Sequence, residues 1–237
     1  MRSSWASWMS AGLRAPAAFA LLAAISFASP SKAEITIQDR RSDVPLVLNK
    51  PDDYILKNVR VAGVLDHAAL TLSGPIRSIR IENSKFGEVR AATDQKAAAM
   101  EAVSASVGQF TVTDSAFYDA ENQLVSLRNG SFGTVTFTHC TFKTSDAFLK
   151  AVYAANPWRT TPPVTEFYNI DRLELLDNEF SNTTIVIHPS VKTVVLRGSL
   201  TNVQVESPQT RIVMLNPTMP AGPTSNPAYA CSGIPKR

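Results

Sequence analysis

Apolar and polar residues alternate in a template that recurs along the chain. Two apolar residues separated by one position precede a polar turn pair, and a large apolar residue follows two positions after that pair. Alternation at a period of two predicts strands that turn every second side chain inward. The five clear copies are 54–61, 79–86, 110–117, 135–142 and 173–180. The copies repeat in one direction, and the interval from the first copy to the second equals that from the third to the fourth. Such a repeat predicts parallel coils rather than hairpins, whose strands are joined by short reversals.

Stacked parallel coils form a β-solenoid, in which each coil buries its apolar face only against its neighbours. A shorter copy at 125–132 predicts a further strand between the third and fourth copies. The inward Ile, Val and Phe positions and the Asn, Asp and Ser turns resemble the right-handed parallel β-helix of the pectate-lyase-like superfamily, over residues 35–215. The resemblance implies an all-β solenoid of about seven coils. An antiparallel β-sandwich is the alternative.

Two of the intervals between copies are longer than the others, and the additional residues predict helical insertions. In the first insertion, Thr93 could cap an alanine-rich helix over residues 94–103. In the second insertion, Ser145 could cap a helix over residues 146–155, which an irregular loop follows. Insertions of this kind often form the binding surface of repeat proteins.

Both ends of the chain differ from the repeat. Residues 1–33 combine a basic start, a short apolar stretch and small residues at Ser31 and Ala33, which predict a secretory signal cleaved after Ala33. A retained membrane anchor is the alternative, although its apolar run is shorter than the ~20 residues that span a bilayer. Residues 211–215 predict a last strand. We therefore expect a signal peptide at 1–33, a β-helix domain at 34–215 and a Pro-rich tail at 216–237, in a periplasmic or secreted protein.

The net charge changes its meaning once the signal is removed. The chain has 23 Lys and Arg residues against 20 Asp and Glu residues. The signal contains three basic residues and no acid, so 23 − 3 = 20 basic residues balance the 20 acids of the mature chain. This balance favours neither a nucleic acid nor an anionic membrane as partner, and no later stretch reaches transmembrane length.

Aligned copies place one polar turn residue of each coil in a column: Asn58, Asn83, Asp114, His139 and Asp177. With the last three copies on adjacent coils, His139 lies between two aspartates, where it could transfer protons or hold a metal. The alternative, which we favour, is a ladder of side chains that hydrogen-bond along the stack and to turn amides. Asp114, His139 and Asp177 are therefore catalytic candidates only if the protein is an enzyme.

The resemblance also implies which residues an enzyme of the family would have. Its lyases typically use an acidic calcium cluster with a nearby Arg or Lys, and its glycosidases use Gly-His-Gly and Arg-x-Lys motifs. The chain has neither motif. We expect no cofactor, and we favour a protein that is not an enzyme.

Candidate ligand-binding residues lie in the second insertion and on a charged strand face. Trp158, Arg159 and Tyr153 form a group suited to stacking on sugar rings, although aromatic residues could equally pin the insertion to the solenoid wall. Arg80 and Glu82 belong to a mixed charged patch, which usually serves only solubility.

The two cysteines leave two interpretations open. Export permits a disulfide between Cys140 and Cys231, which would strap the tail along the solenoid. A small buried thiol at Cys140 is equally natural, because the equivalent positions of other copies are small or polar.

Three functions are consistent with these features. The one we favour is non-catalytic binding of a glycan or cell-wall polymer. The alternatives are a carbohydrate-active enzyme (a polysaccharide lyase, hydrolase or epimerase) and a structural or assembly protein of the cell envelope.

Overall fold

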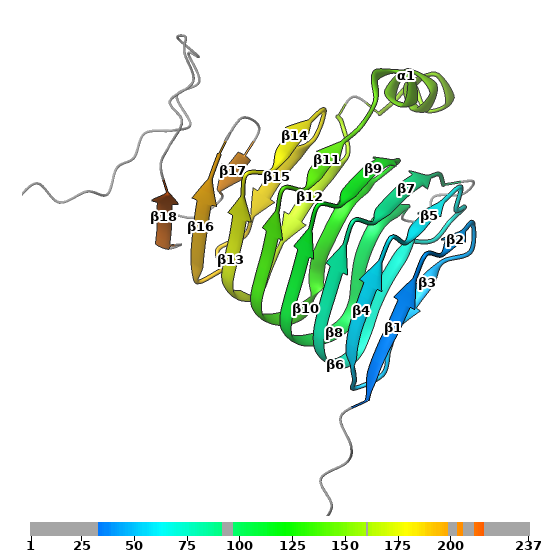
Figure 1. The fold of residues 1–237 in the computed structure, drawn as a ribbon. Coiled ribbons are helices and arrows are strands. Elements are labelled where there is room, and N and C mark those ends of the chain that lie inside the picture. Colours follow the sequence, from blue (N-terminus) through cyan, green and yellow to red (C-terminus); the bar gives the residue numbers. More distant parts are fainter. Residues whose placement is uncertain (1–32, 92–96, 160, 199–202, 206–210, 216–237) are drawn as a thin grey trace, which may run out of the picture. The chain divides into compact units, whose positions relative to one another are not determined.

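Strands make up most of the described chain, and all of their pairings are parallel. The computed structural model describes residues 33–91, 97–159, 161–198, 203–205 and 211–215. These residues form 18 strands and one helix, in a 12-stranded and a six-stranded sheet (Figure 1). The predicted all-β fold with parallel strands is therefore confirmed, and the antiparallel sandwich is wrong.

Successive strands fall into three stacks. The first stack contains β1 (Glu34–Gln38), β4 (Asp53–Lys57), the second halves of β6 (Leu70–Glu82), β8 (Ala98–Thr113) and β10 (Gln123–Thr138), then β13 (Ile170–Leu176), β16 (Thr193–Arg197) and β18 (Arg211–Leu215). The second stack is the six-stranded sheet: β2 (Arg41–Ser42), β5 (Arg60–Ala62), β7 (Lys85–Val89), β9 (Ala116–Ala120), β11 (Thr141–Lys143) and β14 (Glu179–Ser181). The third contains β3 (Leu46–Leu48), the first halves of β6, β8 and β10, then β12 (Val164–Phe167), β15 (Thr184–Ile187) and β17 (Val203–Val205).

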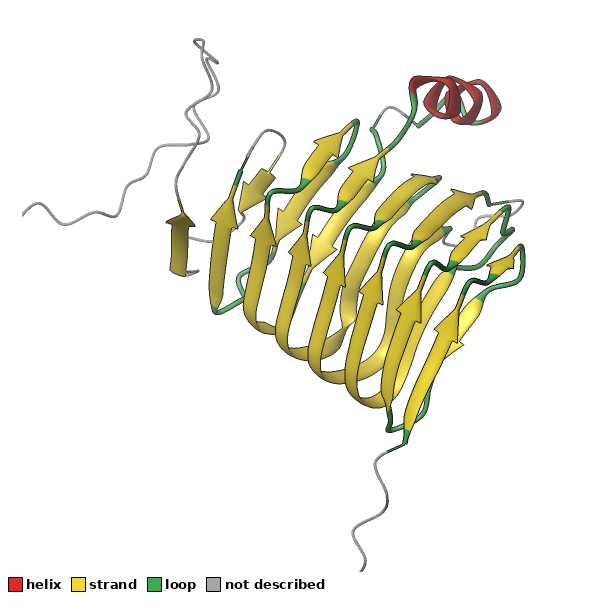
Figure 2. Cartoon of the chain, in the orientation of Figure 1, coloured by secondary structure: helices red, strands yellow, loops and turns green. Residues whose placement is uncertain are grey.

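The chain visits the three stacks in turn, and each visit adds one strand beside the previous one. The long strands β6, β8 and β10 bend between the third stack and the first, as Figure 2 shows. A positive φ at Gly74 and at Ser104 makes this bend in β6 and β8. The arrangement is compatible with a β-helix.

The strand register matches the sequence template residue by residue. The first apolar position of each copy pairs with that of the next copy, and so does the large apolar position. The paired columns are Tyr54, Ile79, Phe110, Val135 and Leu173, and Val61, Phe86, Phe117, Phe142 and Phe180. The shorter copy at 125–132 forms a strand, as predicted, but it is continuous with the strand of the fourth copy in β10.

The core consists of these inward columns. The rings of Phe86 and Phe117 stack with their centroids 5.8 Å apart, and those of Phe117 and Phe142 stack at 5.4 Å. All three side chains are fully buried. Stacked aromatic pairs contribute ~0.5–1.5 kcal/mol beyond the burial of their area, so this column reinforces the coil register.

One predicted helix is confirmed and the other is wrong. Helix α1 (Asp146–Ala155) begins after Ser145, whose Oγ accepts a hydrogen bond from the backbone N of Phe148 at 3.3 Å. Residues 98–103 of the other predicted helix belong to β8 instead, and 92–96 lie outside the described residues. Fully buried Met100 stacks between Leu70 and Val125, so packing overrides the helix propensity of alanine.

The predicted last strand is confirmed as β18. The expected signal peptide, apart from Ala33, and the expected tail with Cys231 lie outside the described residues. No helix of the described part combines the length and apolarity needed to cross a membrane.

Candidate functional site

The turn between the first and second stacks repeats one backbone conformation. Every residue of the predicted turn column has a φ between 46° and 55°. The column continues with Asp39 at 52° and Gly198 at 96°. Glycine adopts this left-handed region without strain, and Asn, Asp and His are the side-chain-bearing residues most enriched there. Backbone geometry is therefore enough to explain the residue types of the column.

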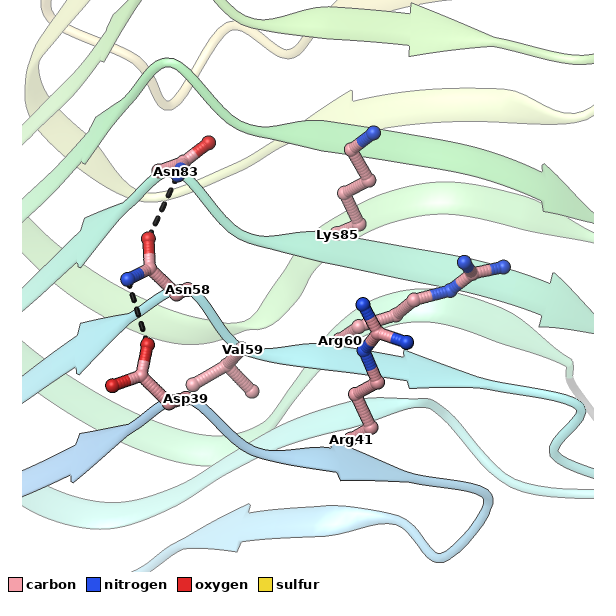
Figure 3. Close-up of a pocket in the computed structure, with 7 residues that line it drawn as sticks. All are labelled: Asp39, Arg41, Asn58, Val59, Arg60, Asn83 and Lys85. Atoms are coloured by element: carbon pink, nitrogen blue, oxygen red, sulfur yellow. Dashed lines mark hydrogen bonds between the residues drawn. The ribbon is translucent and has the colours of Figure 1, made fainter.

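Hydrogen bonds connect the column at its N-terminal end. Asn83 Nδ2 donates to Asn58 Oδ1 at 2.7 Å, and Asn58 Nδ2 donates to Asp39 Oδ1 at 2.8 Å (Figure 3). The hydrogen bond from Asn58, followed by one from Gln38, lowers the pKa of Asp39. These contacts form a ladder along the stack, as the favoured interpretation of the column predicts.

His139 lies between the two aspartates that the sequence predicts as its neighbours. Its Nδ1 is 3.5 Å from Asp114 Oδ1, and its Nε2 is 3.8 Å from Asp177 Oδ2. The His139 side chain is 59% exposed, and Arg197 Nη2 lies 2.6 Å from the same Asp177 oxygen. Both His139 distances exceed those of a good hydrogen bond. Within the described residues, no group of three or more His, Cys, Asp or Glu side chains is arranged to hold a metal.

A second, buried ladder runs beside the turn column. Ser84 Oγ accepts from the backbone N of Val59 at 3.0 Å, and Ser115 Oγ accepts from that of Ser84 at 3.0 Å. Cys140 continues the column, with its backbone N donating to Asn178 Oδ1 at 2.8 Å. Burial raises the pKa of the Cys140 thiol to about 11, despite backbone hydrogen bonds at Ser115 and Thr138 that lower it. Among the residues that the structure describes, this thiol is buried and forms no disulfide.

The second insertion is tied to the coils by Arg159. Its guanidinium donates to the backbone oxygen of Glu121 and to Asn122 Oδ1, and it lies 3.8 Å from Glu121 Oε1. Asn156 Nδ2 also donates to the buried Glu121 carboxylate, at 2.9 Å. Arg159 therefore positions the loop, and the adjacent Trp158 is left 77% exposed.

Aromatic residues in and near the second insertion differ in how much of their side chains is exposed to solvent. Tyr153 is half-buried on α1. Phe167 is fully buried in the core, and Tyr168 stacks on His188 with their ring centroids 4.3 Å apart. Trp158 is therefore the large aromatic side chain that the second insertion presents to solvent.

Charges on the first stack are paired with one another. Glu82 lies 3.2 Å from Lys57 Nζ and 4.0 Å from Arg80 Nε. Arg77 Nη1 lies 2.8 Å from Asp53 Oδ2. The predicted binding residues Arg80 and Glu82 are thus brought together, in a face whose opposite charges neutralise one another across coils.

A groove of about 510 Å³ lies where the turn column meets the second stack, and it contains cations that we did not predict as a site. Arg41, Arg60 and Lys85 follow the turn residues on β2, β5 and β7, and they are in direct register. Figure 3 shows the three side chains on the same side of the sheet. Comparing the position between the turn pair and the large apolar residue in successive copies would have found Arg60 and Lys85, whereas Arg41 lies in a coil outside the five copies. The groove is lined by Asp39, Arg41, Asn58, Val59, Arg60, Asn83 and Lys85.

The middle of this cation row, Arg60, is anchored by neighbouring coils. Glu88 Oε1 lies 3.0 Å from Arg60 Nη2 and accepts a hydrogen bond from the Tyr118 hydroxyl at 3.2 Å. Burial, followed by the charge of Glu88, raises the pKa of Tyr118. The Tyr118 ring covers Gly87, where a side chain would collide with it.

No family model, no curated protein and no solved structure matches this chain.

Proposed function

We propose that the protein is an exported right-handed parallel β-helix of about seven coils, similar to the pectate-lyase-like superfamily, which binds a glycan or cell-wall polymer without cleaving it. The parallel pairing of every described strand supports the fold. Export is supported by the sequence features of residues 1–33.

The groove along β2, β5 and β7 is the observation that carries the binding function. It crosses three successive coils, so it suits an extended chain better than a compact molecule. Its polar lining offers hydrogen bonds and charges, and sugar polymers are rich in hydroxyl groups that use them. The exposed ring of Trp158 adds a second surface on which a sugar could stack.

The turn column supports binding without cleavage. His139 occupies a backbone position that Asn, Asp or Gly occupies in the other coils, and it is solvent-exposed. Solvent exposure works against the desolvated, preorganised charge on which catalysis depends. The column therefore needs no catalytic role to account for its residues.

A glycan array and polysaccharide pull-down with the full chain test this proposal. We expect binding to at least one polymer, weaker binding by Trp158→Ala, and unchanged binding by the control Lys150→Ala, which alters an exposed residue of α1. A blank array, together with a pull-down that Trp158→Ala does not change, would contradict the proposal.

A carbohydrate-active enzyme is the second candidate, and one observation favours it: His139 lies between two carboxylates. Incubation with the polymers that bind, followed by measurement of unsaturated or reducing sugar ends, tests this function. Product release that His139→Ala abolishes would support it. Product release that survives the substitution would place the activity elsewhere.

A further inference from the structure

Three cations are stacked directly on one another along the second stack. Arg41 pairs with Arg60, and Arg60 pairs with Lys85, in the strand register. Side chains at such positions lie ~4.8 Å apart along the sheet, and like charges placed directly opposite each other destabilise it. We call these three residues the cation ladder.

Few acidic side chains lie near the cation ladder. Glu88 pairs with Arg60, whereas Arg41 and Lys85 form no ion pair with any residue in the described part of the chain. The groove contains one carboxylate, Asp39, and its oxygens accept hydrogen bonds from Asn58 and Gln38.

Other surfaces of the same fold show that stacked coils can pair their charges. On the first stack, Lys57 faces Glu82 and Arg77 faces Asp53, each pair on adjacent strands. The second stack could also pair charges in this way. The register position of Lys85 continues through Ala116 and Thr141 to Glu179, so it accepts an acidic residue. The cation ladder is therefore a local excess of positive charge.

We propose that the cation ladder binds an anionic polysaccharide, a linear sugar polymer that carries carboxylate or sulfate groups. This inference rests on the proposed function and adds its ligand class. A row of evenly spaced cations matches a polymer with repeated negative charges, and it attracts that polymer before contact. Arginine also binds carboxylate and sulfate oxygens with two parallel hydrogen bonds.

The lining of the groove favours a sugar polymer over a nucleic acid. None of the seven lining residues is aromatic, whereas sites for single-stranded nucleic acid stack bases on aromatic rings. The carboxamides of Asn58 and Asn83 lie beside the cations, where they can hydrogen-bond sugar hydroxyl groups (Figure 3).

The test compares three polymers that share one sugar backbone: dextran, carboxymethyl dextran and dextran sulfate. Binding to the full chain is measured by calorimetry at low and at high salt. We expect both charged polymers to bind more tightly than dextran, and their binding to weaken with salt because the groove is open to solvent. Carboxymethyl dextran and dextran sulfate distinguish the two sources of negative charge.

Matched variants locate the site. The triple variant Arg41→Gln, Arg60→Gln, Lys85→Gln should lose roughly tenfold or more in affinity, since each exposed ionic contact contributes modestly. The control Lys57→Gln, Arg172→Gln, Lys192→Gln removes the same charge from ion pairs elsewhere and should keep the affinity. Glu88→Gln should tighten binding, because it releases Arg60 from its acidic partner.

The outcomes separate this inference from the proposed function. Equal binding of dextran and its charged derivatives, or equal losses in the two triple variants, would overturn the inference while glycan binding stands. Failure of every polymer here and on the glycan array would overturn both. Tighter binding of single-stranded nucleic acid than of either charged dextran would overturn the polysaccharide assignment.

Discussion

At the scale of single residues, the turn column shows how backbone conformation limits side-chain identity. Each coil passes from the first stack to the second through one residue with a positive φ, and the chain fills that place with Asn, Asp, His or Gly. The presence of His139 between Asp114 and Asp177 follows from the same rule, since all three types tolerate this conformation. The presence of a histidine between two aspartates at this position is therefore explained by the backbone conformation without a catalytic role.

Substitutions at His139 test this explanation. His139→Val should destabilise the protein by about 1–2 kcal/mol, because a β-branched residue is strained at positive φ. His139→Asn removes the same imidazole but keeps a tolerant residue, and its free energy of unfolding should stay close to that of the wild type. Urea denaturation measures both. Equal losses in the two variants would show that the imidazole contacts, rather than the backbone, stabilise this turn.

Cys140 gives a pH-dependent prediction. The unfolded thiol loses its proton near its ordinary pKa of 9.0, whereas the folded thiol keeps it until about 11. Between these values the folded state binds more protons, so this contribution to stability is complete below pH 9 and is lost as the pH rises to 11. The loss amounts to about 3 kcal/mol.

Urea denaturation at pH 8, 9, 10 and 11 of Cys231→Ser and of Cys231→Ser with Cys140→Ser isolates the thiol. Their difference in free energy of unfolding should change with pH by about this amount, since all other groups are shared. A difference that is constant from pH 8 to pH 11 would contradict a buried thiol at Cys140.

At the scale of elements, local preference and packing compete, and the two insertions show both outcomes. Helix α1 forms after its cap Ser145, in a segment that does not pair with the strands of the stacks. The alanine-rich start of β8 has a good helix-forming composition, yet Ala98, Ala99 and Met100 are fully buried in the stack. A sequence pattern finds the cap, but it does not reveal which residues the neighbouring coils will cover.

The attachment of the second insertion depends on the contacts of Arg159 with Glu121 and Asn122. Arg159→Ala should therefore speed chymotryptic cleavage at Trp158 several-fold, because local opening costs less when these contacts are removed. Lys150→Ala on the exposed surface of α1 is the control and should be cleaved at the wild-type rate. Equal rates in the two variants would contradict this role of Arg159.

Close approach between neighbouring coils gives a second prediction at this scale. A Cβ atom at Gly87 would lie 2.1 Å from the backbone oxygen of Tyr118, whereas one at Gly108 would lie 3.0 Å from that of Arg77. Gly87→Ala should therefore cost about 1–3 kcal/mol or more, and Gly108→Ala should cost less. Thermal or urea denaturation measures the order. A reversed order would show that β7 and β9 are packed differently.

At the scale of the whole molecule, the repeat determined how much could be predicted. Five template copies were enough to place inward columns, turns and the large apolar positions, because each coil repeats the constraints of the last. The cation ladder was missed for a physical reason. Its residues are unevenly spaced along the chain. In the coil of Arg41, the position that is large and apolar in the other coils is occupied by Ser42, so the template did not include that coil.

The central claim is that an extended polymer lies along the groove and is not cleaved. Calorimetry with carboxymethyl dextran fragments of graded length tests it most directly, followed by sizing of the recovered fragments. We predict that affinity rises with length until a fragment spans β2 to β7, a distance of ~10 Å, then levels off, with every fragment recovered at its original length. Affinity independent of length, or recovery of shortened fragments, would contradict the account.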